Sequence, residues 1–196
     1  TEQDLTGLEI KKLVFDGNKD VQPGWRDGFN VNGFQLYPGG AGHDILLEDI
    51  ICQNAAGSGF KCDSVSRVTV RRMTCRNNAR HGFGPGSGPG SRTEPGFIGE
   101  SIKSVDNGSQ NNGTGMDVTG GYVQLSGLYL ADNVQGSKIG FSGGQPGYLS
   151  ITAATFRNAG VNSGWRLTAP QDALDGVRLE FDNVQFINPH MSGFRA

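Results

Sequence analysis

The chain repeats one short signature along most of its length. In each copy an Asn stands a few residues before a Gly, and the Gly is followed directly by a large apolar residue. Full copies occupy residues 54–60, 77–83, 111–116, 158–165 and 188–194. A first copy ends at Gly28-Phe29, and a degenerate copy runs from Asp132-Asn133 to Lys138-Ile139, with Lys in place of the Gly. A repeat of this kind indicates a solenoid, whose units bury their apolar faces only by stacking on their neighbours.

A second pattern precedes most copies of the signature. It consists of two alternating apolar pairs separated by one additional residue, as in Ile45, Leu47, Ile50 and Cys52 and again in Val68, Val70, Met73 and Cys75. Only the version before Asn111 is weak. The alternation predicts short half-buried strands, and the additional residue predicts a corner between them. A third strand is expected after each Gly-apolar pair.

Three short strands per repeat of roughly 22 to 30 residues predict an all-β fold, a right-handed parallel β-helix of about seven turns. We expect one domain over residues 1–196. The Asn of each copy should occupy a bend and bond to its neighbours in adjacent turns. The Gly should supply the positive φ of that corner. A β-sandwich is the alternative, because it also combines alternating strands with glycine-rich turns.

Two segments, near 21–42 and 84–99, are longer than the basic turn and are predicted to be loop insertions. Insertions in solenoids gather on one face, which is often the binding face. Neither end of the chain resembles a polar cap, so a longer solenoid that includes this chain is also expected.

Composition excludes several functional classes. The 196 residues include 32 Gly, and 17 basic against 19 acidic residues give a net charge of −2. Such a balance argues against a nucleic-acid partner, and the lack of a long apolar run argues against a membrane span. No signal peptide is visible. Three cysteines, Cys52, Cys62 and Cys75, are too few for a disulfide framework, and a buried thiol ladder is expected instead.

The third strand of each repeat is predicted to carry the functional residues. The residue after each Gly must point inward, so the next residue projects to solvent. The resulting outward row contains Asn30, Lys61, Gly84, Asp117, Gly140 and Arg166, and beside it lie Asn32 and Asp63. Such a face could bind a polar, partly anionic chain. The alternative is that it is merely the polar surface of any solenoid.

Several of these residues resemble the alginate (mannuronan) C5-epimerases, a family of pectate-lyase-like β-helices. The similarity covers roughly residues 8 to 90: Asp16-Gly-Asn-Lys-Asp20, then Asp27-Gly-Phe29, then Gly59-Phe60 with Asp63, then Arg80-His81-Gly82-Phe83. It implies that Arg80 and His81 lie in a uronan-binding cleft with Asp63 as the acidic partner. The family's Asp-Pro-His motif, however, is replaced by Asn30-Val31-Asn32, and its preceding tyrosine by Asp27.

The resemblance therefore implies a carbohydrate-active protein that abstracts the C5 proton of a uronate, as an epimerase or a lyase. This reaction needs cations beside the substrate carboxylate and a base that works near pH 7. The candidate catalytic residues are His81, Arg80 and Asp63, and the candidate substrate-binding residues are Asn30, Asn32, Lys61, Asp117, Arg166 and Asp27.

Three other interpretations stay open. The chain could bind glycans without catalysis, as part of a phage tailspike, a capsid-decorating protein or an adhesin. It could be a glycosidase that uses two of Asp27, Asp63 and Asp117. His81 could also be an ordinary bend histidine, because it shares the inward parity of Phe83.

No cofactor or metal is required by these residues. The segment Asp16-x-Asn18-x-Asp20 begins like an EF-hand loop but lacks the later ligands of that loop. It could therefore bind a Ca²⁺ ion only in another geometry. The expected partner is a polysaccharide, with neither nucleic acid nor membrane. Because β-helices of viral spikes are usually trimers, a homotrimer is also expected. The expected location is extracellular or on a virion surface.

Overall fold

The computed structural model describes residues 7–20, 34–36, 43–62, 66–86, 94–109, 113–118, 120–140, 147–158, 165–168 and 177–188. Within these residues the regular structure is entirely β, and every strand pairing is parallel. No described helix is long and apolar enough to cross a bilayer. The fold is therefore a β-solenoid, and the β-sandwich alternative, which requires antiparallel sheets, is wrong.

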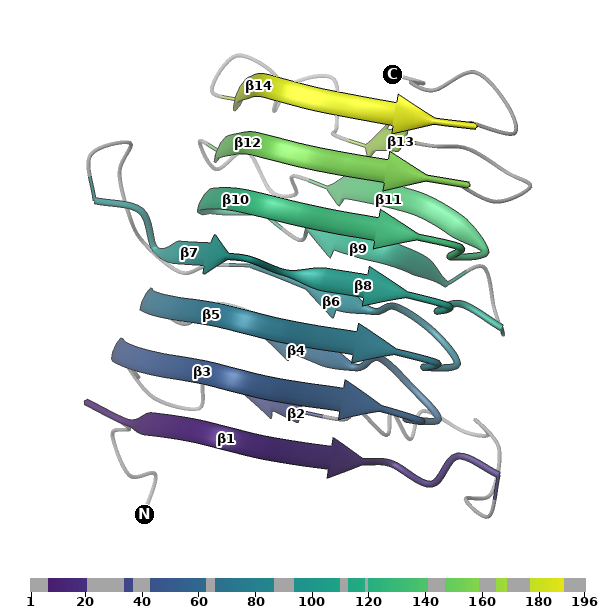
Figure 1. Cartoon of the computed structure of the whole chain (residues 1–196). Coiled ribbons are helices and arrows are strands. Elements are labelled where there is room, and N and C mark those ends of the chain that lie inside the picture. Colours follow the sequence, from purple (N-terminus) through teal and green to yellow (C-terminus); the bar gives the residue numbers. More distant parts are fainter. Residues whose placement is uncertain are drawn as a thin grey trace.

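The strands form two stacked sheets (Figure 1). The long sheet contains, in order, β1 (Glu9–Asp16), β3 (His43–Gln53), β5 (Ser66–Arg76), β7 (Phe97–Glu100) with β8 (Lys103–Val105), β10 (Tyr122–Ala131), β12 (Gly147–Arg157) and β14 (Val177–Ile187). The short sheet contains β2 (Phe34–Leu36), β4 (Phe60–Cys62), β6 (Phe83–Gly84), β9 (Thr114–Val118), β11 (Gln135–Gly140) and β13 (Trp165–Thr168). The chain alternates between them, and we call each long strand with the short strand after it a level.

The corner predicted between the two apolar pairs is a kink inside one long strand rather than a strand end. The kink residue adopts a left-handed conformation at every level, with φ between 51° and 64° at Lys12, Asp49, Arg72, Ser101, Gly127, Ala153 and Asn183. One left-handed residue shifts the side-chain alternation by one position. Both apolar pairs can therefore face the interior. Only at Ser101 does the kink divide the strand, into β7 and β8.

Asparagine side chains form a buried ladder at the bend after each long strand. Asn78 Nδ2 donates to Asn107 Oδ1 at 2.8 Å, and Asn107 Nδ2 donates to Asn133 Oδ1 at 3.0 Å. We call these three residues the inner ladder, and each is 3% exposed or less. An outer ladder on the surface links Asn77 Nδ2 to Asn54 Oδ1 at 2.7 Å and Asn54 Nδ2 to Asp16 at 3.0 Å. The prediction of bonded amides at the bends is confirmed for Asn54, Asn77 and Asn158, whose Nδ2 donates to Asp132 Oδ1 at 2.6 Å.

The role predicted for the glycines of the signature is wrong. Positive φ belongs to the first residue of the bend, such as Asn54 (55°) and Asn77 (54°), and not to Gly59, Gly82 or Gly115. These glycines are needed because the inner ladder lies against them. A Cβ on Gly59, Gly82 or Gly115 would lie 2.4, 2.5 and 2.5 Å from the Nδ2 atoms of Asn78, Asn107 and Asn133, respectively.

The interior between the two sheets is filled by stacked apolar side chains. Phe60 and Phe83 stack with ring centroids 5.3 Å apart, and Phe97 packs on both rings. Cys52 pairs in register with Cys75, and all three cysteines are buried free thiols, as predicted. Burial and the hydrogen bond with Cys52 raise the pKa of the Cys75 thiol well above its usual value.

Three register assignments from the sequence are corrected by the strand pairing. Phe34, and not Phe29, pairs with Phe60. Ser137, and not Ile139, pairs with Met116, so Gly136 is the glycine of that copy. Asp106 occupies the bend expected for Asn111, because its amide donates to the next level's carbonyl, Ala131 O, as Asn77 donates to Val105 O. The sequence pattern failed at that level because Gly99 and Ser104 replace apolar residues.

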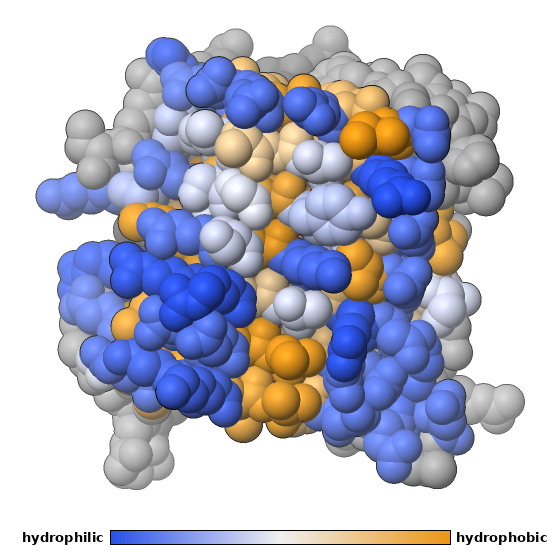
Figure 2. Space-filling view, in the orientation of Figure 1, coloured by the Kyte–Doolittle hydropathy of each residue, from blue (hydrophilic) through white to orange (hydrophobic). Residues whose placement is uncertain are grey.

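Charges of opposite sign alternate from level to level on the outer face of the long sheet. Lys11, Glu48, Arg71 and Glu100 follow one another in register. Arg71 Nε lies 2.9 Å from Glu100 Oε2, and Arg72 Nε lies 2.7 Å from Asp49 Oδ1. Figure 2 shows hydrophilic residues on both sides of an apolar band over the lower strands of this sheet. A slip by one level would bring like charges together, so the pattern specifies the register.

Candidate functional site

The outer face of the short sheet brings together most of the described candidate residues. Lys61 pairs with Gly84, and Asp117 pairs with Lys138. Their strand neighbours, such as Phe60 and Cys62 beside Lys61, are fully buried, so the alternation directs this row outward. The backbone of Gln35 pairs with Lys61 and that of Arg166 with Lys138. Gln35 and Lys138 thus take the positions expected for Asn30 and Gly140.

His81 lies at the bend before β6 and contacts β9 through both ring nitrogens. Its Nδ1 accepts a hydrogen bond from the Thr114 backbone N–H at 3.1 Å, and Thr114 Oγ1 lies 2.9 Å from the same nitrogen. Its Nε2 lies 3.3 Å from Asp117 Oδ2. An amide nitrogen can only donate, so we assign the ring proton to Nε2, directed at Asp117.

The surroundings of His81 disfavour its protonated form. Burial lowers the pKa of His81 to about 3, and the positive charges of Arg80, Lys138 and Lys61 act in the same direction. The imidazole is therefore neutral at pH 7. Its only lone pair suited to a base, on Nδ1, is already used by the Thr114 amide. This arrangement matches the alternative in which His81 is a satisfied bend histidine.

Three cationic side chains of the described residues act on His81, the neighbour of Asp117 on this face. Lys138 Nζ lies 3.9 Å from Asp117 Oδ1, with the Asp117 side chain 12% and the Lys138 side chain 42% exposed. Lys61, Arg80 and Asp117 line the same pocket together with His81, Ser58 and Gly84. We call Lys61, Arg80, Asp117 and Lys138 the basic strip.

The pocket at the basic strip is very small. Its volume is about 30 Å³, the share of one water molecule in the liquid. Sites that enclose a small molecule usually have roughly 300 Å³ or more. A ligand of the basic strip would therefore lie across the surface and send only a single group into the pocket.

Four of the predicted site residues, Asp27, Asn30, Asn32 and Asp63, lie outside the described residues. Their roles, and the carboxylate pairs required for a glycosidase, stay predictions. Arg166 is placed by its backbone alone, one level beyond Lys138.

The sequence interpretation missed Lys138 and Thr114. The repeat pattern places Lys138 at the position of a signature glycine. The short spacing from Asp132-Asn133 to Gly136 is the sequence signal that identifies Gly136 as that glycine instead. No sequence signal indicates Thr114, because it reaches His81 across 33 residues.

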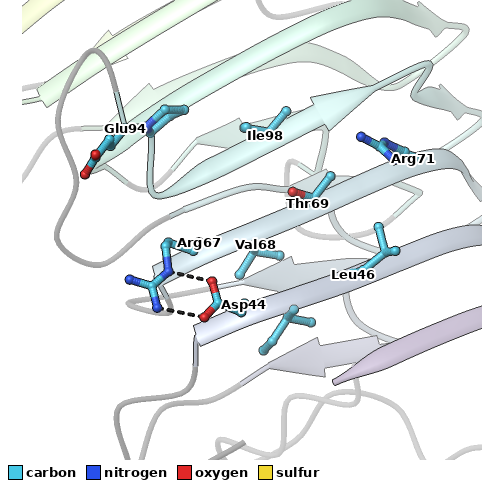
Figure 3. A pocket seen from close by; sticks show the side chains of 10 residues that line it. Asp44, Leu46, Arg67, Val68, Thr69, Arg71, Glu94 and Ile98 are labelled. Atoms are coloured by element: carbon cyan, nitrogen blue, oxygen red, sulfur yellow. Dashed lines mark hydrogen bonds and ion pairs between the residues drawn. The ribbon is translucent and has the colours of Figure 1, made fainter. Parts of the chain in front are cut away.

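A larger cavity of about 640 Å³ lies on the long sheet (Figure 3). Leu46, Thr69 and Ile98, three register-paired residues, line it between Arg67 and Arg71. Arg67 Nε lies 2.6 Å from Asp44 Oδ1, and Arg71 forms the ion pair with Glu100. Both arginines thus have carboxylate partners, and Glu94 adds a further negative charge that acts on Arg67.

The segment that begins like a calcium loop has another role in the structure. Asp16 accepts hydrogen bonds from Gln53 Nε2 at 2.7 Å and from the Asn18 amide at 3.1 Å, besides the bond from Asn54. These bonds hold the pKa of Asp16 below its usual value. Asp16 thus terminates the outer ladder. No group of three metal-ligating side chains occurs in the described part of the chain.

The fold places this protein in the class of parallel β-solenoids. Comparisons go no further: no family model, no curated protein and no solved structure matches the chain.

Proposed function

We propose that the chain binds an acidic, uronate-containing polysaccharide across the basic strip without chemical conversion. The supporting observation is that Lys61 and Arg80 line the pocket of His81 and Asp117, that Lys138 lies 3.9 Å from Asp117, and that all three cations act on His81. Parallel strands repeat about every 4.8 Å, close to the length of one sugar residue in a polymer. Lys61 and Lys138 stand three levels apart in this row, roughly 14 Å at that repeat, with Gly84 and Asp117 between them. They can therefore contact carboxylates about three sugar residues apart.

The geometry of His81 supports binding more than catalysis. A base for C5-proton abstraction needs an accessible lone pair and a pKa near 7. In His81 the lone pair accepts from Thr114, and the pKa lies at about 3. The pocket beside it also holds no more than one small group.

Epimerase or lyase activity is the second candidate, favoured by the 3.3 Å contact between His81 and Asp117. In this case Arg80 and Lys61 would neutralise the uronate carboxylate, and Asp63 would assist. Lysis would raise the absorbance near 235 nm, as unsaturated products absorb there. Epimerisation would change the NMR spectrum of the recovered polymer. Either signal, lost in His81→Ala, would replace the binding proposal.

Binding is tested by titrating the protein with alginate, with pectate and with neutral dextran at low and high salt. We expect binding to the two polyuronates only, weakened by salt because the contacts are exposed ion pairs. Lys61→Ala and Lys138→Ala should each reduce the affinity about three- to tenfold. Lys103→Ala, on the long sheet, is the matched control and should bind normally. Equal affinity for dextran, or equal loss in the control, would contradict the proposal.

Three finer features belong to the same proposal. The right hand of the coil is supported by the strong preference of parallel crossovers for that hand. About seven turns are supported by the seven stacked positions of the long sheet, from β1 to β14. A location outside the cell or on a virion would suit a polysaccharide ligand, whereas the homotrimer stays a prediction. Electron microscopy of the protein would test the hand and the number of turns, sedimentation would test the oligomeric state, and immunolabelling of its source would test the location.

A further inference from the structure

The two ends of the long sheet expose side chains that every inner level buries. β1 and β14 are its outermost strands among the described residues. Phe186 of β14 stacks on Phe156 at 5.2 Å, yet Phe186 is 42% exposed and Phe156 only 3%. Phe181 of β14 is also 42% exposed. At the other end, the inward-facing residues Leu8, Ile10 and Leu13 are only partly buried.

The kink restricts what can pair with these end strands. The left-handed residue is Lys12 in β1 (φ 57°) and Asn183 in β14 (φ 51°). A straight strand would lose register with either one at that point, because the kink reverses the side-chain alternation. A partner strand must therefore have a left-handed residue at the same position. Another copy of this chain has one.

The side chains of β1 and β14 also match when the register is followed through the sheet. Lys11 and Asp182 occupy the same row, linked through Glu48, Arg71, Glu100, Ser126 and Thr152. Phe15 and Phe186 share an inward row in the same way. A second copy would thus place Lys11 against Asp182, continuing the alternation of charge that the first four strands display. It would also continue the row of inward aromatic and apolar residues from Phe186 to Phe15.

We propose that copies of this chain associate head to tail, with β14 of one copy pairing in parallel with β1 of the next. The contact uses two different surfaces and adds each copy along the stacking direction of the strands, so the series stays open. It extends the long sheet and covers Phe181 and Phe186. The assembly is a series of oligomers whose mean size grows with concentration.

A charge exchange tests the contact. Lys11→Asp and Asp182→Lys each place like charges across it, and each variant should self-associate at least about tenfold more weakly in sedimentation velocity runs. An equimolar mixture of the two variants restores opposite charges at both kinds of contact. We expect association of the mixture at wild-type concentrations. Lys103→Asp, in the middle of the sheet, is the control and should associate as the wild type does.

Recovery in the mixture also shows that both variants are folded. The proposal would be overturned if the wild-type protein stayed monomeric at all concentrations up to about 1 mM. A single closed trimer would overturn it as well, as would a mixture that associates no better than its components. Association unchanged in both single variants would place the contact elsewhere.

Discussion

The Thr114 amide determines what the His81 imidazole can do. It donates to Nδ1 at 3.1 Å and leaves Nε2 to carry the proton toward Asp117. A protonated ring would point an N–H at the Thr114 N–H and bring a charge into a site already bordered by Lys61, Arg80 and Lys138. The same cations that suit an anionic ligand therefore keep His81 neutral.

We predict that His81 stays neutral down to a pH of about 3. The unfolded chain binds this proton near pH 6.5, so between these values the unfolded state holds more protons than the folded state. Stability should thus fall as the pH falls from about 6.5, by up to about 1.4 kcal/mol per pH unit for this residue. NMR titration of the ring, with unfolding at each pH, measures both effects.

His81→Asn is the control, because it removes the titrating group and should flatten this part of the pH profile. A His81 ring that titrates near pH 6.5 in the folded protein would contradict the assignment. It would also return His81 to the candidates for a general base.

At the scale of single residues, the sequence predicts which side chains lie at the site but not their hydrogen bonds or protonation. Lys61, Arg80, His81 and Asp117 were all predicted, since motif and alternation place them on one face. The bond to Thr114 could not be predicted, because it depends on how two levels 33 residues apart come together.

Each level of the solenoid is a kinked long strand, a bend and a short strand, and the bend connects neighbouring levels. The asparagine of one level occupies the space that the glycine of the preceding level leaves. The repeat predicted this element because Asn and Gly recur in phase. It assigned positive φ to the Gly instead of the Asn, because both residue types tolerate the left-handed region.

We predict that Gly82→Ala destabilises the protein by roughly 1–3 kcal/mol, as over-packed interiors do. The added Cβ would lie 2.0 Å from Ser104 Oγ in β8 and 2.5 Å from Asn107 Nδ2 in the following bend, both buried in the next level. Thermal and denaturant unfolding followed by circular dichroism would measure the loss.

Gly127→Asn is the matched control. Gly127 does have positive φ, at 64°, but its nearest neighbour to an added Cβ is 3.4 Å away, and Asn183 occupies the same kink position in β14. We expect a change below about 1 kcal/mol there, since Asn tolerates this conformation. Equal losses at Gly82 and Gly127 would contradict the role of the inner ladder, because only Gly82 lies against it.

The described part of the molecule is a row of levels whose strands pair only with those of adjacent levels. The alternating pattern was sufficient to predict the parallel β-solenoid, because only a repeating coil keeps Asn, Gly and apolar residues in phase. It was not sufficient to fix the register at levels that lack one of the repeated residues of the signature, as at Asp106 and Gly136. There the pairing of backbone groups with adjacent levels decides the alignment.

Stability in such a row should be graded from the centre to the ends. β5, β7, β8 and β10 have described neighbours on both sides, with fully buried residues such as Val70, Met73 and Phe97. β14 leaves Phe181 and Phe186 42% exposed. We predict that amide hydrogen exchange, measured by mass spectrometry, is at least about tenfold slower in β5 and β10 than in β1 and β14.

The same measurement at rising protein concentration connects this gradient to association. If β14 of one copy pairs with β1 of the next, both end strands gain a neighbour, and their exchange should slow while that of β5 stays constant. The Lys11→Asp variant should show the gradient at every concentration without this slowing. Exchange that is uniform along the chain would contradict the stacked-level picture of stability, because it would mean that the solenoid opens only as one unit.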